Sequence, residues 1–166
     1  MIEGESAKKL LQKAGRLLAR RAYSRGELEA KLRSQAEEKE IQAVLGRLEE
    51  LNLLNDEQYA YNFAHCRMRQ EGWGPLKVLH ALLRREVASH VAESAIERVR
   101  QETGDGPLLQ EYLEGYCTKH GLPQDRKAIQ KLVSRLRRRG FQEEVIYSVL
   151  RQKIPAAVWH RFDTGD

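Results

Sequence analysis

Apolar residues recur along the chain at intervals of three and four, the spacing that places them on one face of an α-helix. The first such stripe runs through residues 6–21, after Ser6 as a predicted N-cap, and contains Leu10, Leu11, Ala14, Leu17 and Leu18. No run alternates steadily between apolar and polar residues, as a half-buried β-strand would. The pattern therefore predicts an all-α protein.

A capping box marks the start of the second helix. Ser24 is followed three residues later by Glu27, so the hydroxyl can accept from the Glu27 amide while the carboxylate accepts from the Ser24 amide. Leu28, Leu32 and Ala36 form its stripe. Similar stripes predict further helices over about 38–51, 56–67, 75–83, 89–99, 108–120, 127–139 and 143–153.

Two stretches interrupt this pattern. Residues 103–107, Thr-Gly-Asp-Gly-Pro, contain two glycines, a proline and no apolar residue, and are predicted to be a linker. From Pro155 onward the chain is predicted to be a loosely held C-terminal tail, in which Trp159 is the residue able to dock.

The middle helices share a repeated apolar pair, four residues apart. The pairs are Leu28 and Leu32, Val78 and Leu82, and Leu132 and Leu136. Tyr23 and Trp73 each lie five residues before the first member of their pair. The period of about 50 residues predicts three tandem three-helix repeats, over residues 6–55, 56–103 and 107–153, with a tail over 154–166. Because such a unit is too small to bury a full core alone, neighbouring repeats are expected to stack.

Composition limits the class of protein. The chain has 166 residues, of which 32% are charged, and no apolar run approaches the roughly 20 residues that span a bilayer. The N-terminus lacks the basic and apolar regions of a secretory signal. The two cysteines, Cys66 and Cys117, are far apart and do not suggest a disulfide scaffold. A reduced, cytoplasmic protein without membrane partners is expected.

Positive charge is concentrated in the last third of the chain. The net charge is +5, and residues 107–166 hold 11 basic and 7 acidic side chains. On a helix from Lys127, the apolar residues Ile129, Leu132, Val133 and Leu136 share one side. The basic cluster of this stretch consists of Lys127, Lys131, Arg135, Arg137, Arg138 and Arg139. The alternatives are an ordinary solvated helix and a surface that meets an anionic partner.

Aligning the repeats supports the second alternative. Three of the cations, Lys131, Arg138 and Arg139, align with Lys77, Arg84 and Arg85, whereas the first repeat has Glu27, Ser34 and Gln35 at these positions. If repeats 2 and 3 stack, the equivalent cations are predicted to form one positive track.

Residues for catalysis or metal binding are not evident. The chain has no P-loop, GxGxxG, HExxH or GxSxG motif, so an enzyme is not expected and no cofactor is predicted. The pair His65-Cys66 and the pair Cys117 and His120 contain four potential zinc donors, but they lack the usual local spacing. Both cysteines are instead predicted to be small core residues.

Trp73 lies between two glycines and admits two interpretations. It is either a buried pivot between helices or a platform on which a nucleic-acid base stacks beside Lys77 and Arg84. The pivot is the favoured interpretation.

Together these residues resemble the RecX family of regulatory proteins. The resemblance rests on Tyr23-Ser24-x-x-Glu27-Leu28-x-x-Lys31-Leu32, on Leu54-Asn55-Asp56-x-x-Tyr59-Ala60-x-x-Phe63 with Arg69-x-x-Gly72-x-Gly74-Pro75, and on Leu136-x-x-Arg139-Gly140-Phe141 with Ile146. It covers residues 10–153. One departure is Arg85-Glu86-Val87, where the family usually has a Lys-Gly-Ile-like break, so a longer helix or a different turn is expected there.

The resemblance implies a stack of three-helix repeats in an elongated, curved molecule that is not an enzyme. It also implies a partner, the RecA recombinase filament, which such proteins bind in its helical groove to inhibit strand exchange, ATPase and coprotease activities. A monomer is expected. The residues assigned to this contact are Lys77, Arg84, Arg85, Lys127, Lys131, Arg135, Arg137, Arg138 and Arg139, with Trp73. Direct binding of single- or double-stranded DNA through the same basic faces is the alternative.

Overall fold

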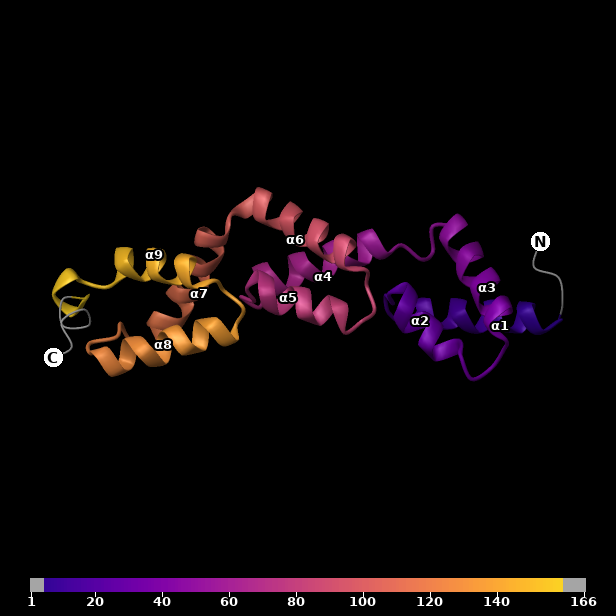
Figure 1. The fold of residues 1–166 in the computed structure, drawn as a ribbon, viewed down its shortest axis with the longest axis horizontal. Coiled ribbons are helices and arrows are strands. Elements are labelled where there is room, and N and C mark those ends of the chain that lie inside the picture. The colour runs from indigo at the N-terminus through magenta and orange to yellow at the C-terminus, as the bar shows by residue number, and fades with distance from the viewer. Residues whose placement is uncertain (1–4, 160–166) are drawn as a thin grey trace. The chain divides into compact units, whose positions relative to one another are not determined.

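The computed structural model describes residues 5–159, and within that range the chain is built of α-helices and short turns, without a β-strand (Figure 1). The all-α prediction is confirmed. The helices are α1 (Glu5–Leu18), α2 (Arg25–Leu32), α3 (Glu38–Glu50), α4 (Asp56–Arg69), α5 (Pro75–Leu83), α6 (Ser89–Thr103), α7 (Asp105–His120), α8 (Arg126–Arg138) and α9 (Glu143–Lys153). In the described part of the chain, no helix combines the length and apolar character that crossing a bilayer requires.

Two helix starts differ from the sequence prediction. Helix α1 already includes Glu5, so Ser6 lies within its first turn and is not an N-cap; its hydroxyl donates to Glu40 Oε2 at 3.2 Å. Helix α8 begins after Asp125, whose carboxylate accepts from the Ala128 amide at 2.7 Å. This cap fixes where the basic helix starts.

The predicted linker at residues 103–107 is wrong. Helix α6 ends at Thr103 and α7 begins at Asp105, so Gly104 alone separates them. Gly104 has a φ of +79°, a value that favours glycine. Pro107 is accommodated in the first turn of α7, where a backbone amide has no acceptor within the helix.

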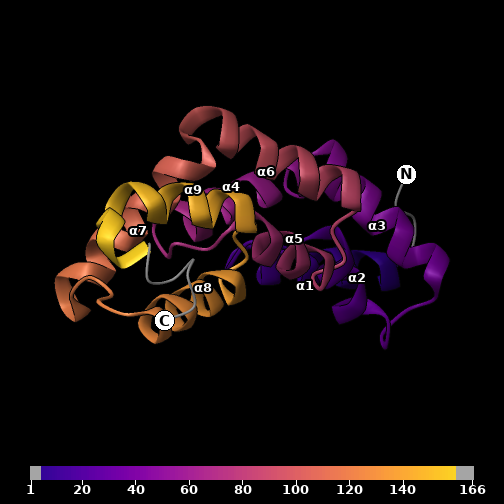
Figure 2. The same cartoon turned by 60° about the vertical axis from the view of Figure 1, so that its left-hand side comes forward.

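Helices α1, α2 and α3 pack on one another and lie together in both views (Figures 1 and 2). Their shared core is apolar, and eight of its nine buried residues belong to the predicted stripes, whereas Leu54 comes from the turn after α3. The buried residues are Leu10, Ala14, Leu28, Leu32, Ile41, Val44, Leu45, Leu48 and Leu54. Burying such side chains contributes roughly 1.5–3 kcal/mol each relative to exposure, which holds the three short helices together.

Helix α9 packs on both α7 and α8. The predicted apolar seam of α8 is confirmed, because Ile129, Leu132, Val133 and Leu136 are all buried. Helix α7 buries Leu108, Leu109 and Leu113, and α9 buries Ile146, Val149 and Leu150. The outer surface of α8 is therefore left to its charged residues.

The start of the predicted tail is packed. The expected docking of Trp159 is confirmed, whereas the expectation of a loose segment is wrong for residues 154–159. Ile154 and Trp159 are buried, the Trp159 ring lies 6.3 Å from that of Tyr147, and its Nε1 donates to the Leu150 carbonyl at 3.4 Å. Apolar burial at these two positions outweighs the cost of ordering the segment. The remainder of the tail, 160–166, lies outside the described residues.

The chain divides into two compact units that do not follow the predicted repeats. The first unit contains the chain up to Phe63 together with residues 81–95, and the second contains residues 64–80 together with the chain from Ile96 onward. Helices α4, α5 and α6 thus contribute residues to both units. The repeat boundaries 6–55, 56–103 and 107–153 stay a proposal.

Within the first unit, the predicted capping box is confirmed. The Glu27 amide donates to Ser24 Oγ at 3.1 Å, and the Ser24 amide donates to Glu27 Oε2 at 3.2 Å. Burial alone would raise the pKa of Glu27, but hydrogen bonds from Arg21, the Ser24 amide and the Tyr59 hydroxyl together lower it. The carboxylate is therefore a charged anchor for the start of α2.

Replacing Glu27 with glutamine should destabilise the protein by about 0.5–1 kcal/mol at neutral pH, since a screened charge and part of a cap are lost. The pKa of Glu27 in the folded state lies below its ordinary value of 4.5, so the charge contributes stability above that pH and loses it as pH falls through the lowered pKa. Urea unfolding of both proteins at pH 7 and pH 3.5 should give a smaller difference in unfolding free energy at the lower pH. An equal difference at both pH values would contradict this role of the charge.

Candidate functional site

The exposed side of α8 is the strongest candidate for a binding surface. Lys127, Lys131 and Arg138 are exposed, and none of the three forms an ion pair with any residue in 5–159. Helix α8 positions them because its opposite side is held by the buried seam and its start by the Asp125 cap. These three residues are called the α8 basic face below.

The remaining cations of the cluster have partners within the protein. Arg137 Nη2 forms an ion pair with Glu143 Oε1 at 2.7 Å. Arg135 is exposed, and its Nε donates to the Tyr112 hydroxyl at 2.9 Å. That hydrogen bond raises the pKa of Arg135 above its ordinary value. Both residues are thus oriented by neighbouring side chains.

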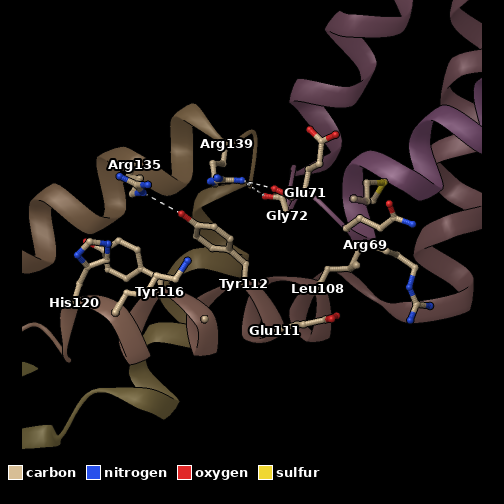
Figure 3. A pocket seen from close by; sticks show the side chains of 14 residues that line it. Arg69, Glu71, Gly72, Leu108, Glu111, Tyr112, Tyr116, His120, Arg135 and Arg139 are labelled. Carbon is tan, nitrogen blue, oxygen red and sulfur yellow. Dashed lines mark hydrogen bonds between the residues drawn. The ribbon is translucent and has the colours of Figure 1, made fainter.

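Arg139 does not belong to the outer surface of α8. Its Nη1 donates to the carbonyl oxygens of Glu71 and Gly72 at 2.6 and 2.9 Å, and its guanidinium lies 4.1 Å from the centre of the Tyr112 ring (Figure 3). It satisfies carbonyl groups just beyond the end of α4, where a helix leaves them without partners. Sequence alignment grouped Arg139 with the outward cations, but its side chain braces the fold.

The aligned cations of the second repeat are likewise divided between exposed and half-buried side chains. Arg84 is exposed, whereas Arg85 is half-buried, lies 4.6 Å from the centre of the Phe63 ring and donates to the Ala81 carbonyl at 2.8 Å. Lys77 is half-buried, with its Nζ 3.9 Å from the Trp73 ring centre. Thus Arg84 alone of this set presents its charge as Arg138 does.

The units also separate these residues. Lys77 shares the second unit with α8, and Arg84 and Arg85 belong to the first. A single positive track across repeats 2 and 3 therefore stays a prediction.

Arg85 and Arg139 mark two equivalent contacts between middle helices, which we call repeat joints. The middle helices of the three repeats are α2, α5 and α8. In each joint, a residue just before one middle helix donates a hydrogen bond to a backbone carbonyl just after the next middle helix. The donor lies four positions before the first residue of the repeated apolar pair. In the first unit the Ser24 hydroxyl donates to the Arg85 carbonyl. In the second unit the Gly74 amide donates to the Arg139 carbonyl at 2.6 Å.

The second joint requires glycine on both sides. A Cβ added to Gly74 would lie 2.3 Å from the Gly140 carbonyl carbon, and one added to Gly140 would lie 2.3 Å from the Lys77 amide nitrogen. Gly140 also has a φ of +89°. Gly140 and Phe141 follow the end of α8, and the Phe141 ring is buried. Gly140 additionally allows the close approach of two backbones.

The turn at Glu86 closely matches the turn at Gly140. The Glu86 amide donates to Leu83 and the Val87 amide to Leu82, just as the Gly140 and Phe141 amides donate to the residues three and five positions before them. Glu86 has a φ of +58°, and α5 ends at Leu83, so the expected longer helix or altered turn is not found. The glutamate adopts the left-handed conformation at a cost of roughly 1–2 kcal/mol.

Replacing Gly26 with alanine should destabilise the first unit by about 2 kcal/mol, because the new Cβ would lie 2.3 Å from Glu86 Cβ. Adding Glu86→Gly should recover about 1 kcal/mol or more, since it removes that overlap and the left-handed strain. The measurement is urea unfolding followed by far-UV circular dichroism. Gly46→Ala in α3 is the control, because its Cβ would meet nothing within 4 Å. Equal costs for the single and double variants would contradict the assigned overlap.

Trp73 is half-buried, which makes it neither a fully buried pivot nor a freely exposed ring. Its amide donates to the Arg67 carbonyl at 2.9 Å, and the cations of Arg67 and Lys77 lie 5.1 and 3.9 Å from its ring centre. These cation–π contacts cover part of the ring. The stacking interpretation stays a prediction.

The possible zinc donors are not assembled into a site. Within residues 5–159, no group of three or more histidine, cysteine, aspartate or glutamate side chains has an arrangement suited to a metal. Cys66 and Cys117 are free and only partly buried, so their prediction as core residues is wrong. The Cys66 thiol faces Gln70 Oε1 at 3.4 Å, and His120 lies against the Tyr116 ring.

A cavity of about 470 Å³ lies within the second unit, between the end of α4, α7 and α8 (Figure 3). Cationic side chains line much of it, including Arg69, Lys119, Arg135 and Arg139. Tyr112 and Tyr116 form an aromatic wall, and Glu111 adds a carboxylate. Sequence reasoning did not identify this cavity, because its walls come from three helices that are distant in the chain.

Comparison with known proteins agrees with the repeat architecture. The chain matches the RecX first three-helix domain over residues 11–48 and the RecX second three-helix domain over residues 55–96. The Regulatory protein RecX of Chlorobaculum tepidum is 32% identical over 147 residues, which cover 88% of each chain. That of Mycolicibacterium vanbaalenii is 32% identical over 159 residues and covers 89% of this chain and 82% of the relative.

A relative from Thermus thermophilus, also named Regulatory protein RecX, is 44% identical over 87 residues, and the match spans 60% of that protein's length and 52% of this chain. The crystal structure of RecX from Lactobacillus salivarius superposes with a TM-score of 0.79 at 22% identity, covering 89% of this chain and 96% of that one. The shared all-α fold and the similarity across most of the sequence place this chain in the RecX family. Its relatives carry the name of regulatory proteins.

Proposed function

We propose that this protein is a regulator that binds RecA filaments in their groove and inhibits the recombinase, ATPase and coprotease activities. Membership of the RecX family is the observation that carries the proposal. Within that function the protein acts by binding, without catalysis and in the cytoplasm, as a monomer.

The α8 basic face supplies a surface suited to such a partner. Lys127, Lys131 and Arg138 are exposed and have no ion pair within residues 5–159, so binding an anionic surface costs them no internal contact. Each exposed charge contributes about 1 kcal/mol or less, so they act collectively. Arg84 and Lys77 are further members of the proposed contact. The Arg139 side chain instead holds the segment after α4, and the Arg85 side chain bonds to the Ala81 carbonyl of α5.

The direct test of function is the rate of ATP hydrolysis by RecA on single-stranded DNA, measured against increasing concentrations of this protein. The proposal expects a saturable fall in rate. An unchanged rate at a several-fold molar excess over RecA would contradict inhibition of the ATPase.

Direct DNA binding is the second candidate function, and the same three exposed cations support it. Lysine and arginine at such positions contact phosphates and carry no sequence information. Affinity for DNA alone should then fall steeply with salt, as counterions are released. Fluorescence anisotropy of a labelled oligothymidylate between 50 and 200 mM salt distinguishes it: binding without RecA and with a steep slope would support this candidate.

A further inference from the structure

The cavity of the second unit contains a guanidinium that is held at one end and open at the other. Arg135 Nε donates to the Tyr112 hydroxyl at 2.9 Å, and the guanidinium lies 5.2 Å from the centre of the Tyr116 ring. Its Nη1 and Nη2 have no hydrogen-bond acceptor among the described residues. A guanidinium fixed in this way presents two parallel N–H groups, which match the two oxygens of a carboxylate.

Other donors line the same part of the cavity. Figure 3 shows Arg135, Tyr116 and His120 together at one end. Lys119 also lines the cavity and forms no ion pair within residues 5–159. These groups give the end of the cavity near Arg135 an excess of donors and positive charge, which favours an anion.

The aromatic side chains are already engaged by the protein itself. The Tyr116 ring lies 4.6 Å from the His120 ring, and the Tyr112 ring lies beneath the Arg139 guanidinium at 4.1 Å. Stacking of a nucleic-acid base would need an open ring face. The exposed Glu111 carboxylate on the cavity wall would also repel a strand that carries a charge at every nucleotide.

The cavity thus favours an anionic group near Arg135 and disfavours negative charge near Glu111. A peptide meets both conditions, since it can place a carboxylate at the first position and a neutral residue at the second. We propose that this cavity binds a carboxylate side chain of an acidic peptide segment, and that Arg135 contacts both carboxylate oxygens. The proposal rests on the proposed function only for the origin of the peptide, which would be an acidic segment on the surface of the protein partner. The site itself is defined by the second unit alone.

The test uses the full chain and a fluorescein-labelled, amidated peptide that carries one glutamate among glycines, followed by fluorescence anisotropy at low salt. Arg135→Gln should weaken binding at least about tenfold, the effect expected when a charged hydrogen-bonding pair is lost. Arg135→Lys should also weaken it several-fold, because lysine keeps the charge but lacks the fork. Arg16→Gln in α1 is the matched control: it removes the same charge from an exposed helical position outside both the cavity and the α8 basic face, and should change affinity less than about twofold.

The same peptide with glutamine in place of its glutamate and an oligothymidylate identify the ligand class. The proposal expects no binding of the glutamine peptide and no displacement of the glutamate peptide by the oligonucleotide at equal concentration. Equal losses for Arg135→Gln and Arg16→Gln would overturn it and indicate general charge attraction. If the oligonucleotide binds the native protein, displaces the peptide and loses affinity in Arg135→Gln, the cavity binds nucleic acid and the proposal is overturned. RecA is absent from this assay, so failure here leaves the proposed function to be judged by its own ATPase measurement.

Discussion

Replacing Gly140 with alanine is expected to lower the free energy of unfolding of the second unit by about 3 kcal/mol or more. A Cβ there would lie 2.3 Å from the Lys77 amide nitrogen, and the residue would be held at a φ of +89°. Overpacking against backbone costs about 1–3 kcal/mol, and the left-handed conformation adds about 1–2 kcal/mol. Gly74→Ala should have a similar effect, since its Cβ would overlap the Gly140 carbonyl group.

The two tryptophans allow this unit to be observed selectively, because Trp73 and Trp159 both belong to it. The midpoint of urea unfolding followed by tryptophan emission should fall by roughly 1–2 M for a cost of this size. Gly115→Ala is the control in the same unit: it lies within α7, its Cβ would meet nothing within 4 Å, and it should stabilise by about 0.5–1 kcal/mol. A Gly140→Ala variant as stable as the native protein would show that the second repeat joint is assigned wrongly.

Reversing the charge of the α8 basic face is the second change with a large expected effect. Lys127→Glu, Lys131→Glu and Arg138→Glu together replace three attractive charges with three repulsive ones. With roughly 0.5 kcal/mol lost per exposed contact and a similar penalty per reversal, the three changes cost about 3 kcal/mol, so inhibition of RecA ATPase should weaken about a hundredfold in apparent affinity.

A matched control guards against a general effect of net charge. The control reverses three exposed cations of the first repeat, which lies outside the predicted positive track. They are replaced with glutamate together and are Lys8, Arg16 and Arg20. This control should inhibit RecA nearly as the native protein does, and both triple variants should keep native helicity by circular dichroism. Equal inhibition by the α8 triple variant and the native protein would remove the α8 basic face from the proposed contact.

Much of the fold follows from local sequence. The stripe of Leu132 and Leu136 predicts which side of α8 is buried, and Ser24 with Glu27 predicts the start of α2. Pro75 begins α5, as a residue without an amide hydrogen suits a first turn. These features depend on residues within one or two helical turns, so periodicity and capping rules are sufficient to find them.

The candidate site was less predictable, because its geometry depends on contacts between distant segments. Alignment of the repeats placed Arg139 with the outward cations, yet it follows the last residue of α8 and reaches carbonyls 67 and 68 residues earlier. The cavity around Arg135 likewise requires α4, α7 and α8 together. One signal was available: Gly74 lies just before α5 and Gly140 lies just after α8, and glycines at these two places are consistent with a close approach of two backbones.

The central claim is that this protein binds the RecA filament. Co-sedimentation with RecA, in the presence and absence of single-stranded DNA and a non-hydrolysed ATP analogue, tests it most directly. The account predicts that the native protein sediments with RecA–DNA filaments, that the α8 triple variant largely stays in the supernatant, and that little sediments when DNA is omitted and filaments do not form. Native protein that stays in the supernatant with intact filaments, while it binds the same DNA without RecA, would contradict the claim.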